Sequence, residues 1–413
     1  MQFLCSLTTV SEIETMKTLI ELYDERPLDN VLATEMFHPE TTVYLCPPEI
    51  AQDKGLKEKL RAYFKARGCR TKLVFIPVSM LDADKIAQAM RRVIQEYPDC
   101  ALDIAGGTDA SLFACGLVSA QEDLAVFTYS RKKNKFFDIR GAAFSQNLPC
   151  PIRLNISDCF QMAGGSMLPG RMNNERLKAY LPMISDFYHL HQKYRAKWVS
   201  IITYIQRISR QEPGPDGLFT AEGPLSVRHN GRVLNAEQDV FRALEKMGLI
   251  RDLRMEEENG IRFVFRDEEA CFFLRDIGSV LELYTYKAAH DAGIFQDVRL
   301  SVVVNWEGGI VNSRSVTNEL DVVAVRGVMP VFISCKTSEI KTEALNELAI
   351  LRDRFGSAVS RAIIVTSAGS VRSVTRNRAY ELGIEIIDQK DLQQEETFQE
   401  RLRAIAKWPE ISD

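Results

Sequence analysis

The sequence predicts an α/β protein in three parts: a doubly wound N-terminal domain over residues 1–150, a small helical connector over residues 151–265, and a second α/β domain over residues 266–413. Three observations lead to this prediction. Short apolar runs alternate with amphipathic segments up to about residue 140, which is typical of strand–helix crossover units and a largely parallel sheet. The alternation then stops, and it returns in the last third of the chain. The length of 413 residues suits two or three domains.

The composition is that of a globular protein and excludes several classes. Hydrophobic residues make up 46% of the chain and charged residues 26%, which excludes a largely disordered chain, a collagen-like fibre and a mainly coiled-coil protein. The formal net charge is −4, so contact with nucleic acid requires a local basic patch rather than an overall basic field. The sequence has no run of 18 uncharged apolar residues, and we expect no membrane span.

The cysteines predict a reducing environment. All nine are scattered, without any Cys-x-x-Cys pair, which favours neither a disulfide framework nor a zinc ribbon. The cytoplasm therefore fits best. Residues 1–15 lack the basic start of a secretion signal, and Glu12 and Glu14 stand where such a signal is uncharged. Because Met16 directly precedes the first expected strand, residues 1–15 are either an added strand or a product of start-site choice.

The first domain is expected to consist of strands and helices in alternation. The expected strands are residues 18–23, 42–46, 73–78, 101–105 and 124–129, with 136–140 as a hairpin partner of the fifth. The expected helices end near residue 37, cover 51–67 and 82–96, and begin again after residue 108. In the third of them, Ile86, Met90 and Val93 fall on one helical face. In a doubly wound sheet of order 3-2-1-4-5, the loops after strands one and four face each other.

The pattern loosens in the connector. Helices are expected within residues 173–208, and the Gly/Pro-rich segment 212–217 marks a boundary. An amphipathic helix over residues 235–247 precedes a hairpin whose second strand is residues 261–265. Helices followed by a small hairpin are typical of a winged-helix-like module.

The last third returns to mixed strands and helices. The expected helices are residues 270–289, 342–355 and 371–382, and the expected strands are residues 298–306, 319–325, 331–336, 361–366 and 385–387. A tight turn near Gly327 joins the second and third of these strands.

The strongest functional signal lies on these two joined strands. Side chains two apart in a strand share a face, so Ser334 and Lys336 point the same way. A turn centred near Gly327 places Asp321 roughly opposite Ser334, and Glu282 on the preceding helix supplies a second carboxylate. Hydrolysis of a phosphodiester uses such a set: carboxylates hold a divalent metal, and a lysine orients the water or offsets the developing charge.

The simpler interpretation is a solvated cross-strand ion pair between Asp321 and Lys336, with Glu282 exposed on its helix. We favour the catalytic interpretation because the spacing, the helix–strand order and the apolar neighbours agree with one another. Lys336 also follows the apolar residues 331–333, which is unusual for a surface lysine.

The order of helix Glu, strand Asp and strand x-x-Lys resembles the PD-(D/E)xK nuclease superfamily, which has a restriction-endonuclease-like α/β fold. Three motifs are similar to those of the DUF1887 group of CRISPR-associated effectors, known as Can2 or Card1: Gly278-Ser-Val-Leu-Glu282, Glu319-Leu-Asp-Val322 and Ser334-Cys-Lys336. The helix with Ala344-Leu-Asn-Glu-Leu348 also fits. The resemblance covers about residues 270–390. It implies catalytic roles for Glu282, Asp321, Ser334 and Lys336, with a Mn²⁺ or Mg²⁺ ion on Glu282 and Asp321.

One position departs from the superfamily pattern. Ser334 stands where the superfamily usually has Glu or Asp, so the metal site lacks one carboxylate. Compensation could come from the backbone carbonyl of Cys335, from a water, or from a relocated acid such as Glu339 or Glu347.

A second candidate site lies at Asp103-Ile-Ala-Gly-Gly-Thr-Asp109, where the fourth strand ends and a helix begins. Glycines let a ligand approach the backbone, and N–H groups at a helix N-terminus favour phosphate. The motif alone is weak, because tight strand–helix turns also use glycine for steric reasons. Its position opposite the loop 24–30, after the first strand, favours a ligand site. The basic run 131–135 is expected to be a solvated turn.

This domain resembles a CARF domain, the Rossmann-like sensor of cyclic oligoadenylates, over about residues 16–145. The resemblance implies a pocket shared by the two subunits of a homodimer. It also implies ligand contacts from Asp24, Glu25, Arg26, Gly106, Gly107, Thr108 and Asp109. Ala105 replaces a common Thr, and Asp109 stands where a Lys is often found. The acidic change disfavours phosphate unless Arg26 or another cation balances it.

Together the two resemblances imply a metal-dependent nuclease of type III CRISPR antiviral defence that cuts DNA or RNA. Its activator would be a cyclic oligoadenylate, with cyclic tetra-adenylate as the family expectation. The alternative is a non-catalytic regulator that binds nucleic acid under control of the ligand, with Ser334 marking a decayed active site. A weaker third hypothesis is that the sensor slowly degrades its own ligand.

Overall fold

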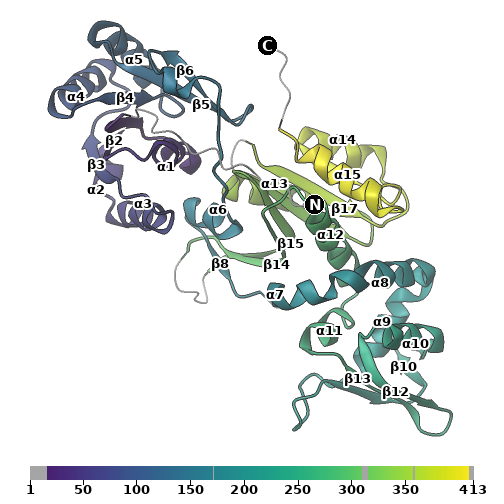
Figure 1. The fold of residues 1–413 in the computed structure, drawn as a ribbon. Coiled ribbons are helices and arrows are strands. Elements are labelled where there is room, and N and C mark those ends of the chain that lie inside the picture. The colour runs from purple at the N-terminus through teal and green to yellow at the C-terminus, as the bar shows by residue number, and fades with distance from the viewer. Residues whose placement is uncertain (1–15, 171, 309–314, 357–358, 409–413) are drawn as a thin grey trace, which may run out of the picture.

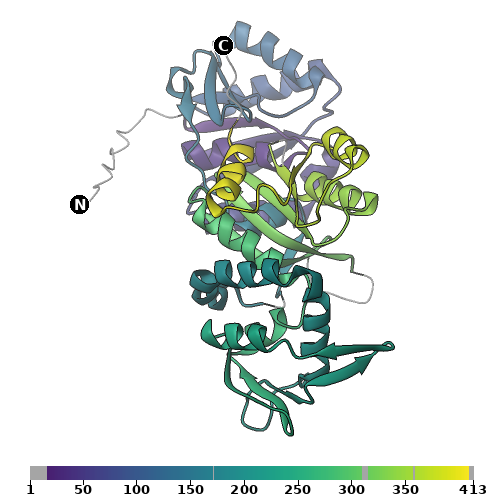
Figure 2. The ribbon, with the colours of Figure 1, turned by 90° about the vertical axis from the view of Figure 1, so that its right-hand side faces the viewer.

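The computed structural model describes residues 16–170, 172–308, 315–356 and 359–408. Within them, the chain folds into three bodies that lie in a row (Figure 1). The N-terminal sheet and its helices lie at one end, and the helical connector lies at the other. Figure 2 shows the C-terminal sheet, in green and yellow, between the two. The order of the bodies in space therefore differs from their order along the chain.

The N-terminal body is built on a seven-stranded sheet of order β3-β2-β1-β4-β5-β6-β7. Strands β1 to β5 are parallel, whereas β6 and β7 are antiparallel additions. The strands are β1 (Thr18–Leu22), β2 (Thr41–Cys46), β3 (Lys72–Pro77), β4 (Cys100–Asp103), β5 (Ala125–Ser130), β6 (Lys135–Arg140) and β7 (Leu148–Pro149). The predicted strand order is confirmed, and β1 lies beside β4.

Helices pack on both faces of this sheet. Successive residues of β1 belong to different core clusters, Leu19 with the residues of α1 and Ile20 with those of α4 and α5. Helices α4 and α5 begin where Asp82 and Thr108 accept backbone N–H bonds as N-caps. The helices are η1 (Pro27–Asn30), α1 (Leu32–Phe37), α2 (Pro48–Gln52), α3 (Lys54–Ala66), α4 (Ala83–Glu96), α5 (Asp109–Glu122) and η2 (Ala143–Ser145).

The middle body contains a six-stranded mixed sheet of order β18-β17-β16-β15-β14-β8. Strands β16, β17 and β18 are parallel, and the other neighbours are antiparallel. The strands are β8 (Ser166–Leu168), β14 (Asp297–Asn305), β15 (Thr317–Arg326), β16 (Met329–Lys336), β17 (Arg361–Thr366) and β18 (Ile384–Ile387). The turn between β15 and β16 lies at Gly327, as the sequence predicts.

The assignment of all of residues 151–265 to the connector needs correction, whereas the N-terminal sheet ends with β7 at Pro149, close to the expected residue 150. Strand β8 pairs with β14, and Phe160 of α6 (Ile156–Met162) packs against Phe332 and Phe355. Residues 156–168 therefore belong to the middle body although they precede the connector. A strand of three residues carries too little periodicity to be recognised in the sequence.

The helices of the middle body also differ from expectation in two places. The expected helix over residues 270–289 is wrong: it is divided, because Asp276 Oδ1 accepts the N–H groups of Gly278 and Ser279 and starts a new helix. A last helix, α15, was not expected. The helices are α11 (Glu268–Phe273), α12 (Ser279–Asp291), α13 (Thr342–Phe355), α14 (Ser373–Glu381) and α15 (Glu395–Ile405).

The connector combines helices with a small antiparallel sheet of order β12-β13-β9, which agrees with the predicted winged-helix-like module. Its helices are α7 (Asn174–Leu177), η3 (Lys178–Tyr180), α8 (Leu181–Lys193), η4 (Arg195–Lys197), α9 (Trp198–Ile208) and α10 (Gln238–Lys246). Its strands are β9 (Thr220–Gly223), β10 (Ser226–His229), β11 (Arg232–Asn235), β12 (Ile250–Glu256) and β13 (Gly260–Phe265). Tyr188 of α8 stacks on Tyr284 of α12 with ring centroids 3.8 Å apart. This contact joins the connector to the middle body.

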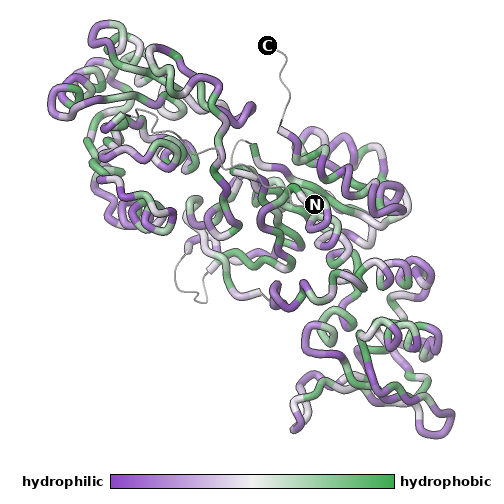
Figure 3. Tube along the Cα trace, in the orientation of Figure 1, coloured by the Kyte–Doolittle hydropathy of each residue, from purple (hydrophilic) through white to green (hydrophobic). Residues whose placement is uncertain are grey.

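Hydrophobic residues concentrate on the strands of the middle sheet, whereas the surrounding helices carry hydrophilic residues as well (Figure 3). Neighbouring Val322 and Val323 belong to core clusters on opposite faces, as strand alternation requires. None of the helices in the described ranges combines the length and the apolar character that a membrane crossing needs.

Candidate active site

Three of the predicted catalytic residues lie together on two neighbouring strands. Strands β15 and β16 pair in the predicted register, with Asp321 beside Ser334. The Ser334 hydroxyl donates to Asp321 Oδ2 over 3.0 Å, and the backbone N–H of Cys335 donates to the same oxygen over 2.6 Å. Lys336 Nζ lies 3.7 Å from that oxygen. The register therefore brings Asp321, Ser334 and Lys336 to one place.

Asp321 is oriented from one side only. Burial raises its pKa above the ordinary value, although Lys336 and the two hydrogen bonds from Cys335 and Ser334 oppose the rise. All these partners approach Oδ2, and no donor from the described part of the chain bonds Oδ1. Oδ1 is thus open to a further partner.

Glu282 lies in the first turn of α12 and shares the electrostatic field of this site. Its pKa is raised from the ordinary value of 4.5 to about 8, first by burial and then by the charges of Asp321, Asp276 and Glu319, while Lys336 lowers it. The absent side chain of Gly278 leaves room for this carboxyl group, because a Cβ there would lie 3.1 Å from Glu282 Oε1. Two carboxyl groups with raised pKa values therefore share one site.

This donor set fits a divalent cation with few protein ligands. Mg²⁺ and similar hard cations are commonly held by one or two carboxylates together with waters and substrate phosphates. A cation would offset the cost of ionising Glu282 and Asp321 side by side. Among the described residues, however, no group of three or more His, Cys, Asp or Glu side chains is already assembled to hold a metal. Glu282 and Asp321 are two side chains of this site that could bind a cation directly.

A small cavity of about 50 Å³ adjoins Asp321, Ser334 and Lys336. Its other polar lining residues are Glu319 of β15 and Glu347 of α13. Glu319 belongs to the motif Glu319-Leu-Asp-Val322, but no role is predicted for it from the sequence. Strand alternation puts Glu319 on the same face as Asp321, and this signal was sufficient to find it.

The Glu282 pKa predicts how stability depends on pH in the metal-free protein. The folded state holds a proton on Glu282 up to about pH 8, whereas the unfolded state loses it near pH 4.5. Stability should therefore fall as pH rises from about 5 to about 8. Thermal unfolding from pH 5 to pH 8 should show a smaller decline in Glu282→Gln than in the wild type. Equal declines in the two proteins would contradict a raised Glu282 pKa.

The predicted sensor residues meet at the carboxyl ends of β1 and β4. The N–H of Gly107 donates to Asp24 Oδ2 over 3.0 Å, so the two loops face each other as the strand order predicts. Arg26 makes two bonds of 2.8 Å to the Asp24 carboxylate and lies 3.1 Å from Asp29. The exposed Arg26 is therefore already paired with acids of its own loop.

The turn Gly106-Gly-Thr108 has a structural role. A Cβ on Gly106 would lie 2.9 Å from the carbonyl oxygen of Leu22, and Gly107 has φ +97°. Thr108 begins α5 as its N-cap, and its hydroxyl also bonds the carbonyl of Met80. Asp109, in contrast, is exposed in the first turn of α5. The steric explanation for the glycines is thus present, and ligand contacts by this turn stay a prediction.

The loop of residues 24–30, called the sensor loop below, lines a cavity together with residues of the middle body. A cavity of about 570 Å³ is lined by the loop residues Glu25, Arg26, Pro27 and Leu28 and by residues 353–356 at the end of α13. Helix α13 also lines the cavity beside Asp321 through Ala344, Glu347, Leu348 and Leu351. One helix therefore extends from the sensor loop to the candidate catalytic residues.

Buried acidic residues next to these two loops were not expected. Glu21 of β1 and Asp103 of β4 lie side by side in the sheet. Burial raises both pKa values, that of Asp103 to about 8. Arg131, expected in a solvated turn, instead pairs with the buried Asp29 and bonds the carbonyl of Ala105.

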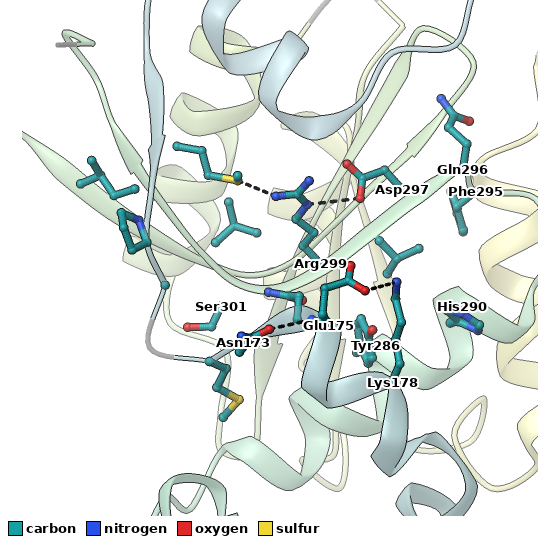
Figure 4. A pocket seen from close by; sticks show the side chains of 18 residues that line it. Asn173, Glu175, Lys178, Tyr286, His290, Phe295, Gln296, Asp297, Arg299 and Ser301 are labelled. Carbon is teal, nitrogen blue, oxygen red and sulfur yellow. Dashed lines mark hydrogen bonds and ion pairs between the residues drawn. The ribbon is translucent and has the colours of Figure 1, made fainter. Parts of the chain in front are cut away.

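A larger cavity of about 790 Å³ lies between α7, the end of α12 and β14 (Figure 4). Of the residues that line it, Lys178 pairs with Glu175 over 2.7 Å and Arg299 with Asp297 over 3.3 Å. The cavity therefore offers no surplus positive charge to an anionic ligand.

The C-terminal part of the chain is similar to a known protein domain. Residues 267–405 match the model of the Card1-like endonuclease domain. The structure of VC1899 from Vibrio cholerae has 18% sequence identity and a TM-score of 0.73, covering 95% of this chain and 99% of that chain. The structure of Can2 from Sulfobacillus thermosulfidooxidans in complex with cyclic tetra-adenylate has 14% identity and a TM-score of 0.65, covering 94% and 99%. No curated protein sequence matches the chain.

At these identities, the two structures show a shared fold over nearly the whole chain. The resemblance to Can2/Card1-like effectors, which the motifs predicted, is confirmed by this fold and by the match of the endonuclease domain. The predicted fold class is confirmed as well.

Proposed function

We propose that this protein is a metal-dependent nuclease of type III CRISPR defence that is activated by a cyclic oligoadenylate. The observation that carries the proposal is the convergence of Asp321, Ser334 and Lys336 on two strands within the segment that matches the Card1-like endonuclease domain. Glu282 adds a second carboxyl group to the same site, since the charge of Asp321 contributes to its raised pKa.

Each residue has a distinct role in the proposed reaction. Glu282 and Asp321 Oδ1 would hold Mn²⁺ or Mg²⁺, which polarises a phosphoryl oxygen and lowers the pKa of a bound water. The Ser334 hydroxyl and the Cys335 N–H keep Asp321 from rotating. Lys336 orients the attacking water or offsets the negative charge that develops on the phosphoryl group.

The activator would bind at the carboxyl ends of β1 and β4, the switch point of the doubly wound sheet. The residues proposed to contact it are Asp24, Glu25, Arg26, Gly106, Gly107, Thr108 and Asp109. Support comes from the structural neighbour Can2, which was solved with cyclic tetra-adenylate. A phosphate would compete with Asp24 for Arg26. The freed loop would then move relative to the end of α13, with which it lines one cavity.

Two copies of the chain would form the complete sensor. A ligand with two-fold symmetry suits an isologous dimer, which presents the same loops twice around one axis. We therefore propose a homodimer with both Gly106-Gly-Thr108 turns near that axis.

The test is a cleavage assay with Mn²⁺ on DNA and RNA, with and without cyclic tetra-adenylate, combined with light scattering. The expected result is strong cleavage only with activator, by a protein of twice the chain mass of 46.8 kDa. A monomeric mass in both conditions would contradict the shared pocket.

The second candidate function is a non-catalytic regulator that binds nucleic acid under control of the ligand. Ser334 favours it, because this position adds no negative charge to the metal site. Ligand-dependent binding of nucleic acid by a wild type that cleaves nothing under any activator would support the regulator and contradict the nuclease.

A further inference from the structure

The candidate metal site has two carboxyl groups and a serine where a third acid would stand. Ser334 donates its proton to Asp321 over 3.0 Å, so it holds Asp321 in place without adding charge. Divalent cations bind more tightly as the charge of the ligand set increases. An acid close to Ser334 would therefore compensate for the missing carboxylate.

Two nearby acids are engaged elsewhere. Glu339 follows β16 but pairs with Arg372 over 2.6 Å, where both side chains are about two-thirds exposed. Glu319 lines the cavity but accepts the hydroxyl of Ser301 on β14. Since β14 and β16 flank β15 on opposite sides, this bond draws Glu319 away from Ser334.

Glu347 is exposed and lines the same cavity as Asp321 and Ser334. It lies on the face of α13 that lines the cavity, together with Ala344, Leu348 and Leu351, at the i, i+3, i+4, i+7 spacing of one helical face. Its Oε1 accepts a 2.7 Å bond from Asn318 Nδ2. Trp306 in turn donates to Asn318 Oδ1 over 2.7 Å. Because an indole N–H only donates, Trp306 fixes which end of the Asn318 amide faces Glu347.

The volume of the cavity bears on whether Glu347 would contact a cation directly or through a water. The cavity of about 50 Å³ beside Asp321 has room for a water, since a water needs roughly 10–15 Å³ of such space. Three acids within ligating distance of one point do not occur in the described residues. Glu347 would therefore reach a cation held by Asp321 through a water rather than by direct ligation.

We propose that Glu347 supplies the negative charge that Ser334 lacks, as a positioning residue that accepts a hydrogen bond from a metal-bound water. This inference rests on the proposed nuclease function and deepens it. Glu347 lies on α13, the helix that also lines the cavity beside residues 25–28.

The test measures Mn²⁺ binding by electron paramagnetic resonance in the full-length protein, without substrate. Glu347→Gln should weaken Mn²⁺ affinity by about tenfold or more, as is usual for outer acids of metal sites. Ser334→Glu in the Glu347→Gln background should recover most of the loss. Glu339→Gln is the matched control, and it should bind as the wild type does.

A purely structural role for Glu347 predicts a different pattern. Glu347→Asp keeps the charge and should stay within a few-fold of the wild type, even if the Ser334→Glu variant does not fold. Equal loss in Glu347→Asp and Glu347→Gln would overturn the proposal. Wild-type affinity in Glu347→Gln together with weak binding by Asp321→Asn would overturn it and leave the nuclease function standing. Unchanged affinity in all three variants would overturn the metal site itself.

Discussion

Asp321→Ala and Lys336→Ala should each lower activated, Mn²⁺-dependent cleavage by about a hundredfold or more, without weakening activator binding. Asp321→Ala removes the carboxylate on which Ser334, Cys335 and Lys336 converge. Lys336→Ala removes the one cation placed 3.7 Å from Asp321 in that cluster. Both groups act on the chemical step, where such losses are characteristic. Single-turnover cleavage and equilibrium binding of the activator separate the two effects.

Two control variants make this prediction specific. Ser334→Ala should cost much less, because the Cys335 N–H still holds Asp321 Oδ2 over 2.6 Å. Glu339→Ala, which breaks an exposed ion pair with Arg372, should change cleavage little. Wild-type cleavage by Asp321→Ala under activation would contradict the assignment of the catalytic site.

Gly107→Val should abolish activation and weaken activator binding by more than tenfold. Gly107 has φ +97°, and a Cβ there would lie 2.5 Å from Ser111 Oγ and 2.9 Å from Leu22 Cδ1. The turn would have to move, which breaks the N–H bond to Asp24 and disturbs the start of α5. Isothermal titration with cyclic tetra-adenylate measures the loss. Mn²⁺ binding at the distant site should be unchanged.

Gly116→Ala, in the helix α5 that follows this turn, is the matched control, because nothing lies within 4 Å of its added Cβ. A second variant separates ligand contact from local distortion. Asp109 is exposed at the start of α5, so Asp109→Asn should tighten binding of the anionic activator a few-fold and more strongly at low salt. Unchanged affinity in both Gly107→Val and Asp109→Asn would show that the ligand binds elsewhere.

Local rules explain why the candidate catalytic residues could be found from the sequence. A strand has a side-chain period of two, and the turn at Gly327 sets the register of β15 and β16. These two facts suffice to put Asp321 beside Ser334 and to place Lys336 on the same face. The sensor loops were predictable for a similar reason, since alternation of strands and helices implies the strand order that brings Asp24 to Gly107.

Short-range periodicity and tight turns were enough to predict the fold class, the strand order of the N-terminal sheet and the pairing of Asp321 with Ser334. The remaining features depend on tertiary structure. It put β8 into the middle sheet, raised the Glu282 pKa to about 8 by burial, and paired Arg131 with Asp29. It also placed Glu347, rather than Glu339, along the cavity beside Asp321. These outcomes depend on which distant segments pack together and exclude water, and no local pattern carries that information.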